Sequence, residues 1–165
     1  MSESFRYEHI QHFTAGTVGP KGQRTFYIQF GNPGELISLK LEKGQVSALA
    51  EFFNRLLDDV EPIAIDDVPL ALDLIEPIES AWVVSSIGIA YEEDSASFVF
   101  VAEELIDEED DDEAPTPATA ELRLSHGQVQ AFVTRARDLM SSGRPPCDYC
   151  GRPLDHDDGW CPCHN

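Results

Sequence analysis

One eight-residue pattern occurs twice in the sequence, and it constrains the fold more than any other feature. Residues 39–46 read Leu-Lys-Leu-Glu-Lys-Gly-Gln-Val, and residues 122–129 read Leu-Arg-Leu-Ser-His-Gly-Gln-Val. In each copy, leucines at alternate positions are typical of a strand, and a turn and an amphipathic helical spacing follow them. The repetition predicts two similar units, each ending in a strand, a tight turn and a helix.

The residues before the first copy predict three antiparallel strands. We expect these strands over 13–19, 24–30 and 35–41, which are β-prone or alternate polar and apolar residues. Turns at 20–23 and 31–34, both rich in proline and glycine, join them. Residues 5–9 also allow an edge strand. A helix over 44–59 follows, because its apolar residues recur at helical spacing. That stripe contains Val46, Leu49, Ala50, Phe53, Leu56 and Leu57.

The residues before the second copy predict the same succession of elements. Strands are expected over 81–91 and 97–102, and a helix over 127–141. A shift of 72 residues aligns Gly16 with Gly88 and Phe26 with Phe98, whereas a shift of 83 aligns the two octapeptides. An acidic stretch at 103–117 accounts for the difference between the two shifts.

We therefore predict an α+β fold made of internally duplicated β-β-β-α units, a pseudo-dimer with an antiparallel sheet and packed helices. The first unit spans residues 1–60 and a linker spans 61–80. The second unit spans 81–143 and includes the acidic loop 103–117. A tail that resembles a zinc knuckle spans 144–165.

The charge of the chain narrows its possible partners. Asp and Glu number 31 against 11 Lys and Arg, which gives a net charge of −20. A chain this acidic repels phosphate backbones, so nucleic acid is disfavoured as a partner. Nine of the acids lie between Glu103 and Glu113, where we predict a solvated loop. Docking of a basic partner to this loop is the alternative.

The sequence predicts a cytoplasmic protein without a membrane anchor. No stretch approaches the roughly 20 apolar residues that cross a bilayer. The first residues lack the basic and apolar regions of a signal peptide. All four cysteines lie after residue 146, whereas a secreted disulfide protein would distribute them over its fold.

A glycine-rich hairpin carries the only basic residues that suggest an anion site. Gly16, Gly19 and Gly22 do not have the spacing of a dinucleotide-binding loop, and no helix follows them directly. A structural hairpin is therefore the favoured interpretation. If this region binds a small phosphorylated metabolite, Lys21 and Arg24 are the expected contacts.

The C-terminal cluster predicts a structural zinc site. Cys147 and Cys150 are two residues apart and a glycine follows them, which is the shape of a zinc knuckle. Cys161 is the third expected ligand. The fourth is Cys163 or His164, and His156 is a more distant candidate. The closed set of four ligands favours a structural role for Zn²⁺, because a catalytic zinc keeps one position open.

Two further interpretations of the cluster stay open: a redox pair at Cys147 and Cys150, and thiols without metal. Elsewhere the sequence contains no Gly-x-Ser-x-Gly, Walker or His-Glu-x-x-His motif, so no catalytic residue is predicted.

With these residues identified, the chain resembles the DUF3090 family, a mainly actinobacterial family of uncharacterised proteins. The resemblance rests on four segments that together extend over nearly the whole length. They are 13–29, 41–46, 87–91 and the cysteine segment from Ser142 to Asp155. Here Trp160 stands before the third cysteine, where family members often have a histidine. The resemblance implies no established reaction, although family members tend to be encoded near a histidine-type phosphatase and a kinase-like protein.

These observations predict a non-enzymatic binding or adaptor module that acts on a protein partner. The first alternative is an enzyme or binding protein for a small phosphorylated metabolite. The second is a single-stranded nucleic-acid binder, which the charge disfavours.

Overall fold

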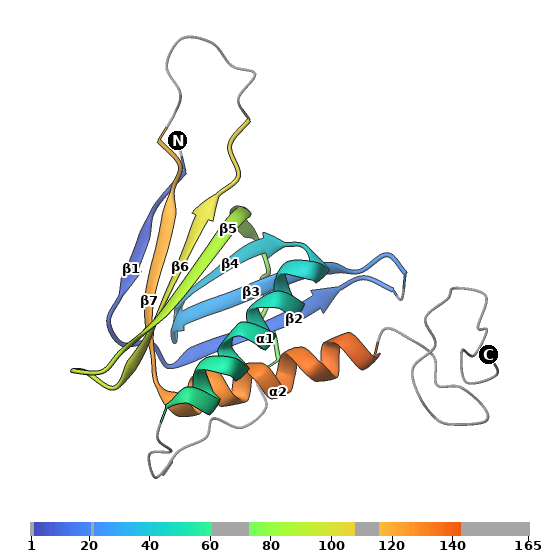
Figure 1. Ribbon diagram of the computed structural model, residues 1–165. Coiled ribbons are helices and arrows are strands. Elements are labelled where there is room, and N and C mark those ends of the chain that lie inside the picture. The colour runs from blue at the N-terminus through green and yellow to red at the C-terminus, as the bar shows by residue number, and fades with distance from the viewer. Residues whose placement is uncertain (1, 21, 61–72, 108–115, 143–165) are drawn as a thin grey trace, which may run out of the picture.

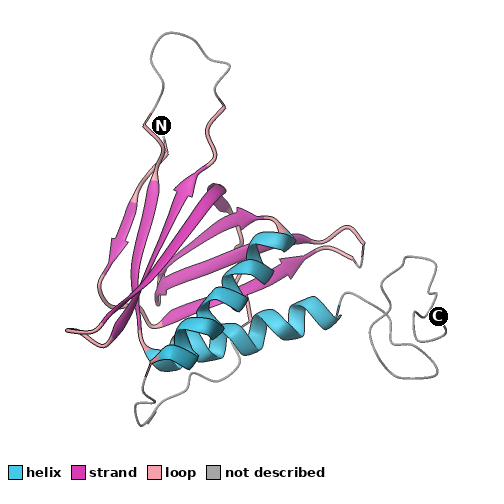
Figure 2. Ribbon diagram, in the orientation of Figure 1, coloured by secondary structure: helices cyan, strands magenta, loops and turns pink. Residues whose placement is uncertain are grey.

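In the part of the chain that the structure describes, seven strands form one mixed sheet, and two helices lie side by side on one of its faces (Figures 1 and 2). The computed structural model describes residues 2–20, 22–60, 73–107 and 116–142. Its elements in chain order are β1 (Phe5–Tyr7), β2 (His12–Val18), β3 (Thr25–Asn32), β4 (Glu35–Leu41), α1 (Lys43–Asp59), β5 (Ser80–Glu92), β6 (Ser97–Glu104), β7 (Thr119–Leu124) and α2 (His126–Ser142).

The strands are arranged in the order β1-β7-β6-β5-β4-β3-β2. The triples β2-β3-β4 and β5-β6-β7 are antiparallel, as the hairpin turns predict. β4 and β5, however, run parallel, and so do β1 and β7. The prediction of an antiparallel sheet is therefore wrong at these two junctions. The chain leaves β4 through α1 before it reaches β5, and such a crossover connects parallel strands.

Three strands followed by a helix occur twice in the observed order, as β2-β3-β4-α1 and as β5-β6-β7-α2. Both helices extend one residue before the predicted start, and α2 one residue past the predicted end. Origin of the two units by duplication stays a prediction, as do the proposed domain boundaries.

The octapeptides start both helices with the same hydrogen bonds. The Gln45 Oε1 atom accepts from the Glu42 N–H at 2.7 Å, and the Gln128 Oε1 atom accepts from the Ser125 N–H at 3.0 Å. These capping boxes satisfy backbone donors at the two helix starts. The repeated glutamine is thus explained by local structure.

The sheet curves around an aromatic core. The ring of Phe13 in β2 lies 5.8 Å from that of Phe100 in β6, although three strands separate β2 from β6 in the sheet. Phe53 of α1 and Phe132 of α2 contact the Phe13 ring from the helix side. The helices therefore fill the concave face of the sheet.

The outer face of β2, β3 and β4 is covered by a strap, which we define as residues 73–77. The Gln29 side chain accepts from the Ile75 N–H and donates to the Ile75 carbonyl, both at 2.9 Å. The Leu74 side chain lies directly over Gly16. His12 and Ser38 hydrogen-bond the same glutamine, so a buried polar cluster holds the strap.

Neither described helix is long and apolar enough to cross a membrane.

Candidate functional site

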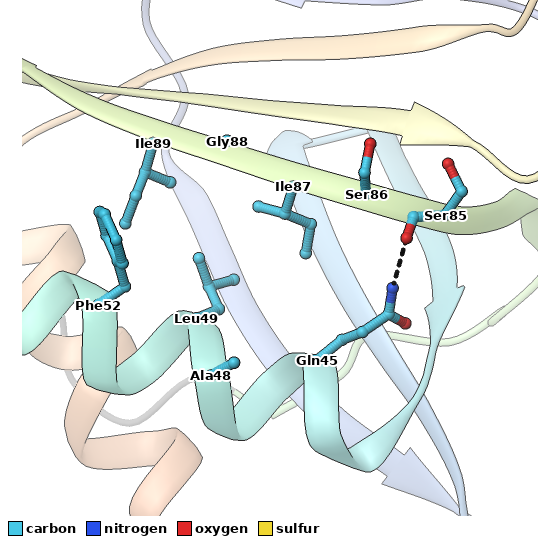
Figure 3. Close-up of a pocket in the computed structure, with 9 residues that line it drawn as sticks. All are labelled: Gln45, Ala48, Leu49, Phe52, Ser85, Ser86, Ile87, Gly88 and Ile89. Carbon is cyan, nitrogen blue, oxygen red and sulfur yellow. Dashed lines mark hydrogen bonds between the residues drawn. The ribbon is translucent and has the colours of Figure 1, made fainter.

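A groove lies between α1 and β5 on the concave side of the molecule (Figure 3). Its volume is about 390 Å³, within the range typical of ligand-binding clefts. Leu49 and Phe52 on α1 face Ile87 and Ile89 on β5 across the groove. The lining residues are Gln45, Ala48, Leu49, Phe52, Ser85, Ser86, Ile87, Gly88 and Ile89.

One edge of β5 borders this groove. The register of β4 with β5 ends at Lys40 and Val83, whereas β5 continues to Glu92. Beyond Val83, no other strand of the described residues pairs with β5 on this side. In an antiparallel pair, every second residue directs its N–H and C=O groups away from its partner strand. β5 therefore presents backbone hydrogen-bonding groups toward the groove.

One end of the groove is polar and held in a fixed geometry. The Gln45 Nε2 atom donates to the carbonyls of Val84 and Ser85 at 3.3 and 3.2 Å. The same side chain closes the capping box of α1, so both of its ends are engaged. Gln45 therefore ties the start of α1 to β5 and closes this end of the groove.

The other end of the groove is apolar and open. Phe52 is 48% exposed, an unusual degree for a phenylalanine beside the core. Ile87 and Ile89 are half-buried beneath it. Exposed apolar surface and unpaired strand edges are both typical of interaction sites, and here Phe52 lies next to the unpaired edge of β5.

The seam between α2 and β2 is the counterpart of this groove in the other unit. A shift of 83 places Arg135 at the position of Phe52, and a shift of 72 places Ala15 at that of Ile87. The Arg135 Nε atom donates to the Ala15 carbonyl at 3.1 Å, and its Nη2 atom lies 3.1 Å from Asp73 Oδ1. The arginine therefore closes the strand edge that Phe52 leaves open.

The groove offers binding but no evident catalysis. The described residues that line it include no titratable side chain, so they provide no general acid or base. They provide apolar area and a strand edge, whereas the Ser85 hydroxyl is engaged with the Glu103 and Glu104 carbonyls of β6. In known peptide-binding domains, a free strand edge beside apolar pockets binds an extended backbone.

Of the site residues that we predicted from the sequence, Arg24 is described, and it does not line the groove. The Arg24 guanidinium donates to the Leu139 carbonyl at 3.4 Å and lies 5.2 Å from the Phe26 ring, which it faces. It joins β3 to the last turn of α2. Lys21 lies outside the described residues. So do all proposed zinc ligands: Cys147, Cys150, Cys161, Cys163 and His164, with His156. Among the described residues, no group of three acids, histidines or cysteines forms a metal site.

The groove was not predicted from the sequence, although one signal for it is present. Phe52 lies next to Phe53 but outside the apolar stripe of α1. A second phenylalanine beside a complete stripe indicates apolar surface that the core does not use. The free edge of β5 had no such signal, because it depends on where β4 ends.

This arrangement defines an α+β protein with an apolar groove at a strand edge. The sequence pattern of the family described as "Protein of unknown function (DUF3090)" matches residues 5–161. The chain belongs to this family, as its resemblance predicted. No curated protein and no solved structure matches it.

Proposed function

We propose that this protein is a non-enzymatic binding module that accepts an extended peptide segment of a partner protein in the groove between α1 and β5. The observation that carries the proposal is the unpaired edge of β5 beside the exposed Phe52. Addition of a strand to a free sheet edge is an established mode of peptide recognition.

In this proposal, the backbone and the side chains of the bound peptide contact different parts of the groove. The peptide backbone hydrogen-bonds the outward-facing groups of β5 between Ser86 and Glu92. Its alternate side chains pack on Ile87, Ile89 and Phe52, because side chains alternate along a strand. Gln45 limits the peptide at one end, since it already engages the carbonyls of Val84 and Ser85.

The negative charge of the chain favours peptides with basic residues on either side of the bound segment. The lining of the groove is uncharged, so the segment inside it is apolar or small. The net charge of −20 attracts positive charge toward the molecule over distances of about a Debye length, ~8 Å at physiological salt. We therefore expect apolar peptides flanked by lysine or arginine, and binding that weakens as salt increases.

A peptide library displayed on phage and selected against the full chain tests the proposal. Selected peptides should bind Phe52→Arg at least about tenfold more weakly than wild type, as is typical when a central apolar contact is lost. The new arginine should also donate to the Ile87 carbonyl, as Arg135 does to Ala15. Phe52→Leu is the matched control, because it keeps an apolar side chain and should retain most of the affinity. Equal binding to wild type and Phe52→Arg would refute the groove as the site.

The alternatives receive less support. Binding of a phosphorylated metabolite through Arg24 would compete with the contacts of this arginine to Leu139 and Phe26. Nucleic-acid binding is opposed by the charge. Cytoplasmic localisation is part of the proposal, and it rests on the position of the cysteines in the sequence.

We further propose that the tail binds one structural Zn²⁺ through Cys147, Cys150 and Cys161, with Cys163 or His164 as the fourth ligand. The support is the spacing of these residues, which matches closed zinc sites. Native mass spectrometry of protein purified without chelator should show one zinc per chain. A chain that carries no metal and has free thiols would reject the site.

We also propose that the two β-β-β-α units arose by duplication. The support is that the octapeptide occurs twice and that its glutamine makes corresponding hydrogen bonds in both copies. Gln45 of the first unit bonds β5, and the Gln128 Nε2 atom of the second unit donates to the Ile10 carbonyl at 2.7 Å, just before β2. Each glutamine thus ties its own helix to the other unit.

A further inference from the structure

β5 contains one residue more than its partner strand at the point where the groove begins. Val84 pairs with Glu104 of β6. Ser86 pairs with Glu103, the preceding residue of β6, so Ser85 has no partner of its own. Two residues opposite one form a β-bulge. β2, the counterpart of β5 beside α2, pairs with β3 without interruption along its whole length. The bulge therefore distinguishes the open groove from the seam between α2 and β2.

This bulge decides which side chains line the groove. Side chains alternate between the two faces of a strand, and one inserted residue reverses the alternation beyond it. Val84, before the bulge, is buried in the core on the concave side. Without the bulge, Gly88 and Ala90 would follow it on that side. With the bulge, Ile87 and Ile89 face α1 instead, as Figure 3 shows. The apolar wall of the groove, defined as these two isoleucines, therefore depends on one inserted residue.

Two side chains hold the bulge from opposite sides. The Ser85 hydroxyl lies 3.1 Å from the Glu103 carbonyl oxygen and 3.2 Å from that of Glu104, so it bonds the stretch of β6 opposite the bulge. From α1, the Gln45 Nε2 atom donates to the carbonyls of Val84 and Ser85. Successive carbonyls alternate in direction along a regular strand, and the bulge brings both within reach of one amide. The bulge is therefore bonded to β6 and to α1.

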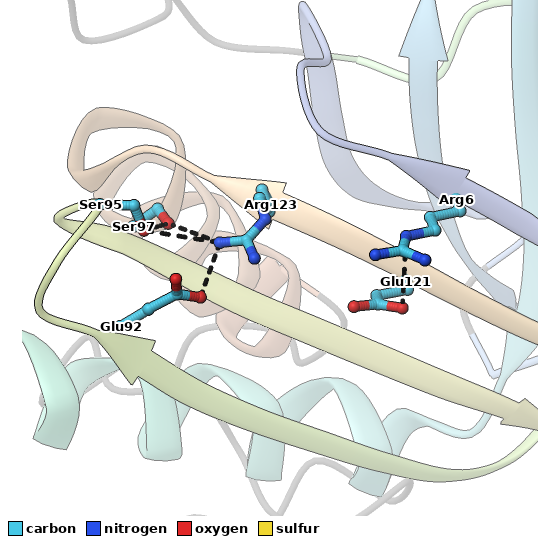
Figure 4. Close-up of polar contacts among 6 residues, drawn as sticks. All are labelled: Arg6, Glu92, Ser95, Ser97, Glu121 and Arg123. Atoms are coloured by element: carbon cyan, nitrogen blue, oxygen red, sulfur yellow. Dashed lines mark hydrogen bonds and ion pairs between the residues drawn. The ribbon is translucent and has the colours of Figure 1, made fainter.

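The far end of β5 is fixed by a separate set of contacts (Figure 4). Glu92 and Ser97 form the last pair of β5 with β6. The Arg123 Nη1 atom on β7 lies 2.7 Å from Glu92 Oε2 and 3.4 Å from Ser97 Oγ. A change at Ser85 therefore acts on the segment between these two anchors, and that segment contains the apolar wall.

We propose that Ser85 is a positioning residue for peptide recognition, because its hydroxyl holds the bulge that turns Ile87 and Ile89 toward α1. This inference rests on the proposed function and adds the sequence pattern that the groove selects. An added strand has the same period as β5, so the peptide side chains beside the two isoleucines are two residues apart. The groove therefore selects apolar residues at peptide positions i and i+2. The residue between them faces the other side, where Gly88 leaves open space.

Peptides selected by phage display against the full wild-type chain are the probes of this inference. Each is compared with a version in which the residues at i and i+2 are replaced by serine. The ratio of the two dissociation constants measures the preference for apolar residues. Wild type should prefer the apolar version by at least about tenfold. Ser85→Ala should reduce this preference by about fivefold, the effect of one lost hydrogen bond, because the wall is no longer held toward α1.

Two control variants separate the hydroxyl from other effects of the substitution. Ser85→Thr keeps the hydroxyl and should retain the wild-type preference. Ser86→Ala changes the neighbouring serine of the groove, whose hydroxyl makes no hydrogen bond to the described part of the chain. This variant should also bind as wild type does. An equal loss in Ser85→Ala and Ser86→Ala would overturn the inference, because it would assign the effect to polarity in the groove and not to the bulge.

Methyl NMR without peptide tests the role of Ser85 separately from the proposed function. The signals of Ile87 and Ile89 should broaden by exchange on the microsecond to millisecond time scale in Ser85→Ala, but not in wild type or Ser86→Ala. Unchanged signals, or an unchanged peptide preference in Ser85→Ala, would overturn the inference. If wild type selects no peptide, the proposed function fails together with the i and i+2 pattern. Broadening in Ser85→Ala would then still establish that Ser85 positions the wall.

Discussion

The seam between α2 and β2 is closed, whereas the seam between α1 and β5 is open, although the sequence places them at corresponding positions. In the closed seam, Arg135 donates to the edge of β2 and pairs with Asp73 of the strap. In the open seam, Phe52 leaves the edge of β5 without such a donor and stays 48% exposed. The main difference is the residue at this one position: Arg135 closes the α2 seam, whereas Phe52 leaves the α1 seam open as a candidate binding groove.

The outer faces of the two triples differ in the same way. The strap covers β2, β3 and β4, while the outer face of β5, β6 and β7 is free of other described elements. The first unit is thus buried on the side where the second is accessible. The candidate groove lies where α1 of the first unit meets β5 of the second, so both units contribute to it.

The largest expected effect comes from the packing of the two seams. Phe132 and Leu49 correspond at a shift of 83, but Phe132 is 1% exposed and its ring lies 4.9 Å from that of Phe13. Phe132→Ala should lower the free energy of unfolding by about 3–5 kcal/mol. Leu49→Ala should cost about 2 kcal/mol, because it borders an existing cavity. Denaturant unfolding measures both, and equal losses would contradict the difference in packing.

The second prediction concerns the two outer faces. A Cβ atom at Gly16 would lie 2.4 Å from Leu74 Cγ, whereas one at Gly88 would meet nothing within 4 Å. Gly16→Ala should therefore displace the strap and destabilise the fold by about 2 kcal/mol. Gly88→Ala should be neutral or slightly stabilising, because it removes backbone freedom from the unfolded chain. Thermal unfolding of the pair checks the opposite signs. Similar losses would show that the strap is not what makes Gly16 necessary.

The third prediction tests the arginine that closes the α2 seam. Arg135→Met keeps the aliphatic stem but removes the bonds to Ala15 and Asp73, and it should cost about 1.5 kcal/mol. The ion pair contributes little of this, since the Asp73 side chain is 86% exposed. Asp73→Asn is the control and should change stability by less than about 0.5 kcal/mol. A larger effect of Asp73→Asn would assign the closure to the ion pair.

The helices and hairpins were predictable from the sequence because their determinants are local. Helical spacing of apolar residues located α1 and α2 to within one residue, and the turns 20–23 and 31–34 located the hairpins. The parallel junction of β4 with β5 was not predictable in this way. It depends on the path of the chain between α1 and β5, and no local pattern encodes that path.

The candidate groove lay beyond prediction for a similar reason. Phe52 was visible as an extra apolar residue, but the free edge of β5 arises because this strand continues nine residues past its last pairing with β4, from Val83 to Glu92. Arg24 was predicted as an anion contact because Lys21 and a glycine-rich hairpin lie next to it in the sequence. In the fold its guanidinium is engaged with Leu139 and Phe26. The cysteine cluster lies outside the described residues, and its zinc stays a prediction.

The smallest expected effect comes from the glutamines of the two octapeptides. The Gln128 Nε2 bond to Ile10 is short, at 2.7 Å, and partly buried. The Gln45 bonds are longer, at 3.3 Å to Val84 and 3.2 Å to Ser85, and the second of them is exposed. Gln128→Ala should cost about 1 kcal/mol and Gln45→Ala about 0.5 kcal/mol, since the loss of a short, partly buried hydrogen bond is more costly. Denaturant unfolding of both variants checks this order.

The glutamate variants at the same positions separate capping from the bond to the other unit. A glutamate keeps the acceptor of the capping box and is favourable at a helix start, but it cannot donate to a carbonyl. Gln45→Glu should therefore unfold like wild type, because its donor contributes little. Gln128→Glu should lose nearly as much as Gln128→Ala, because it places a carboxylate against the Ile10 carbonyl. If the two glutamate variants lost the same free energy of unfolding, the hydrogen bonds from each helix to the other unit would be equally strong in both seams. The open groove would then owe its exposure to Phe52 alone.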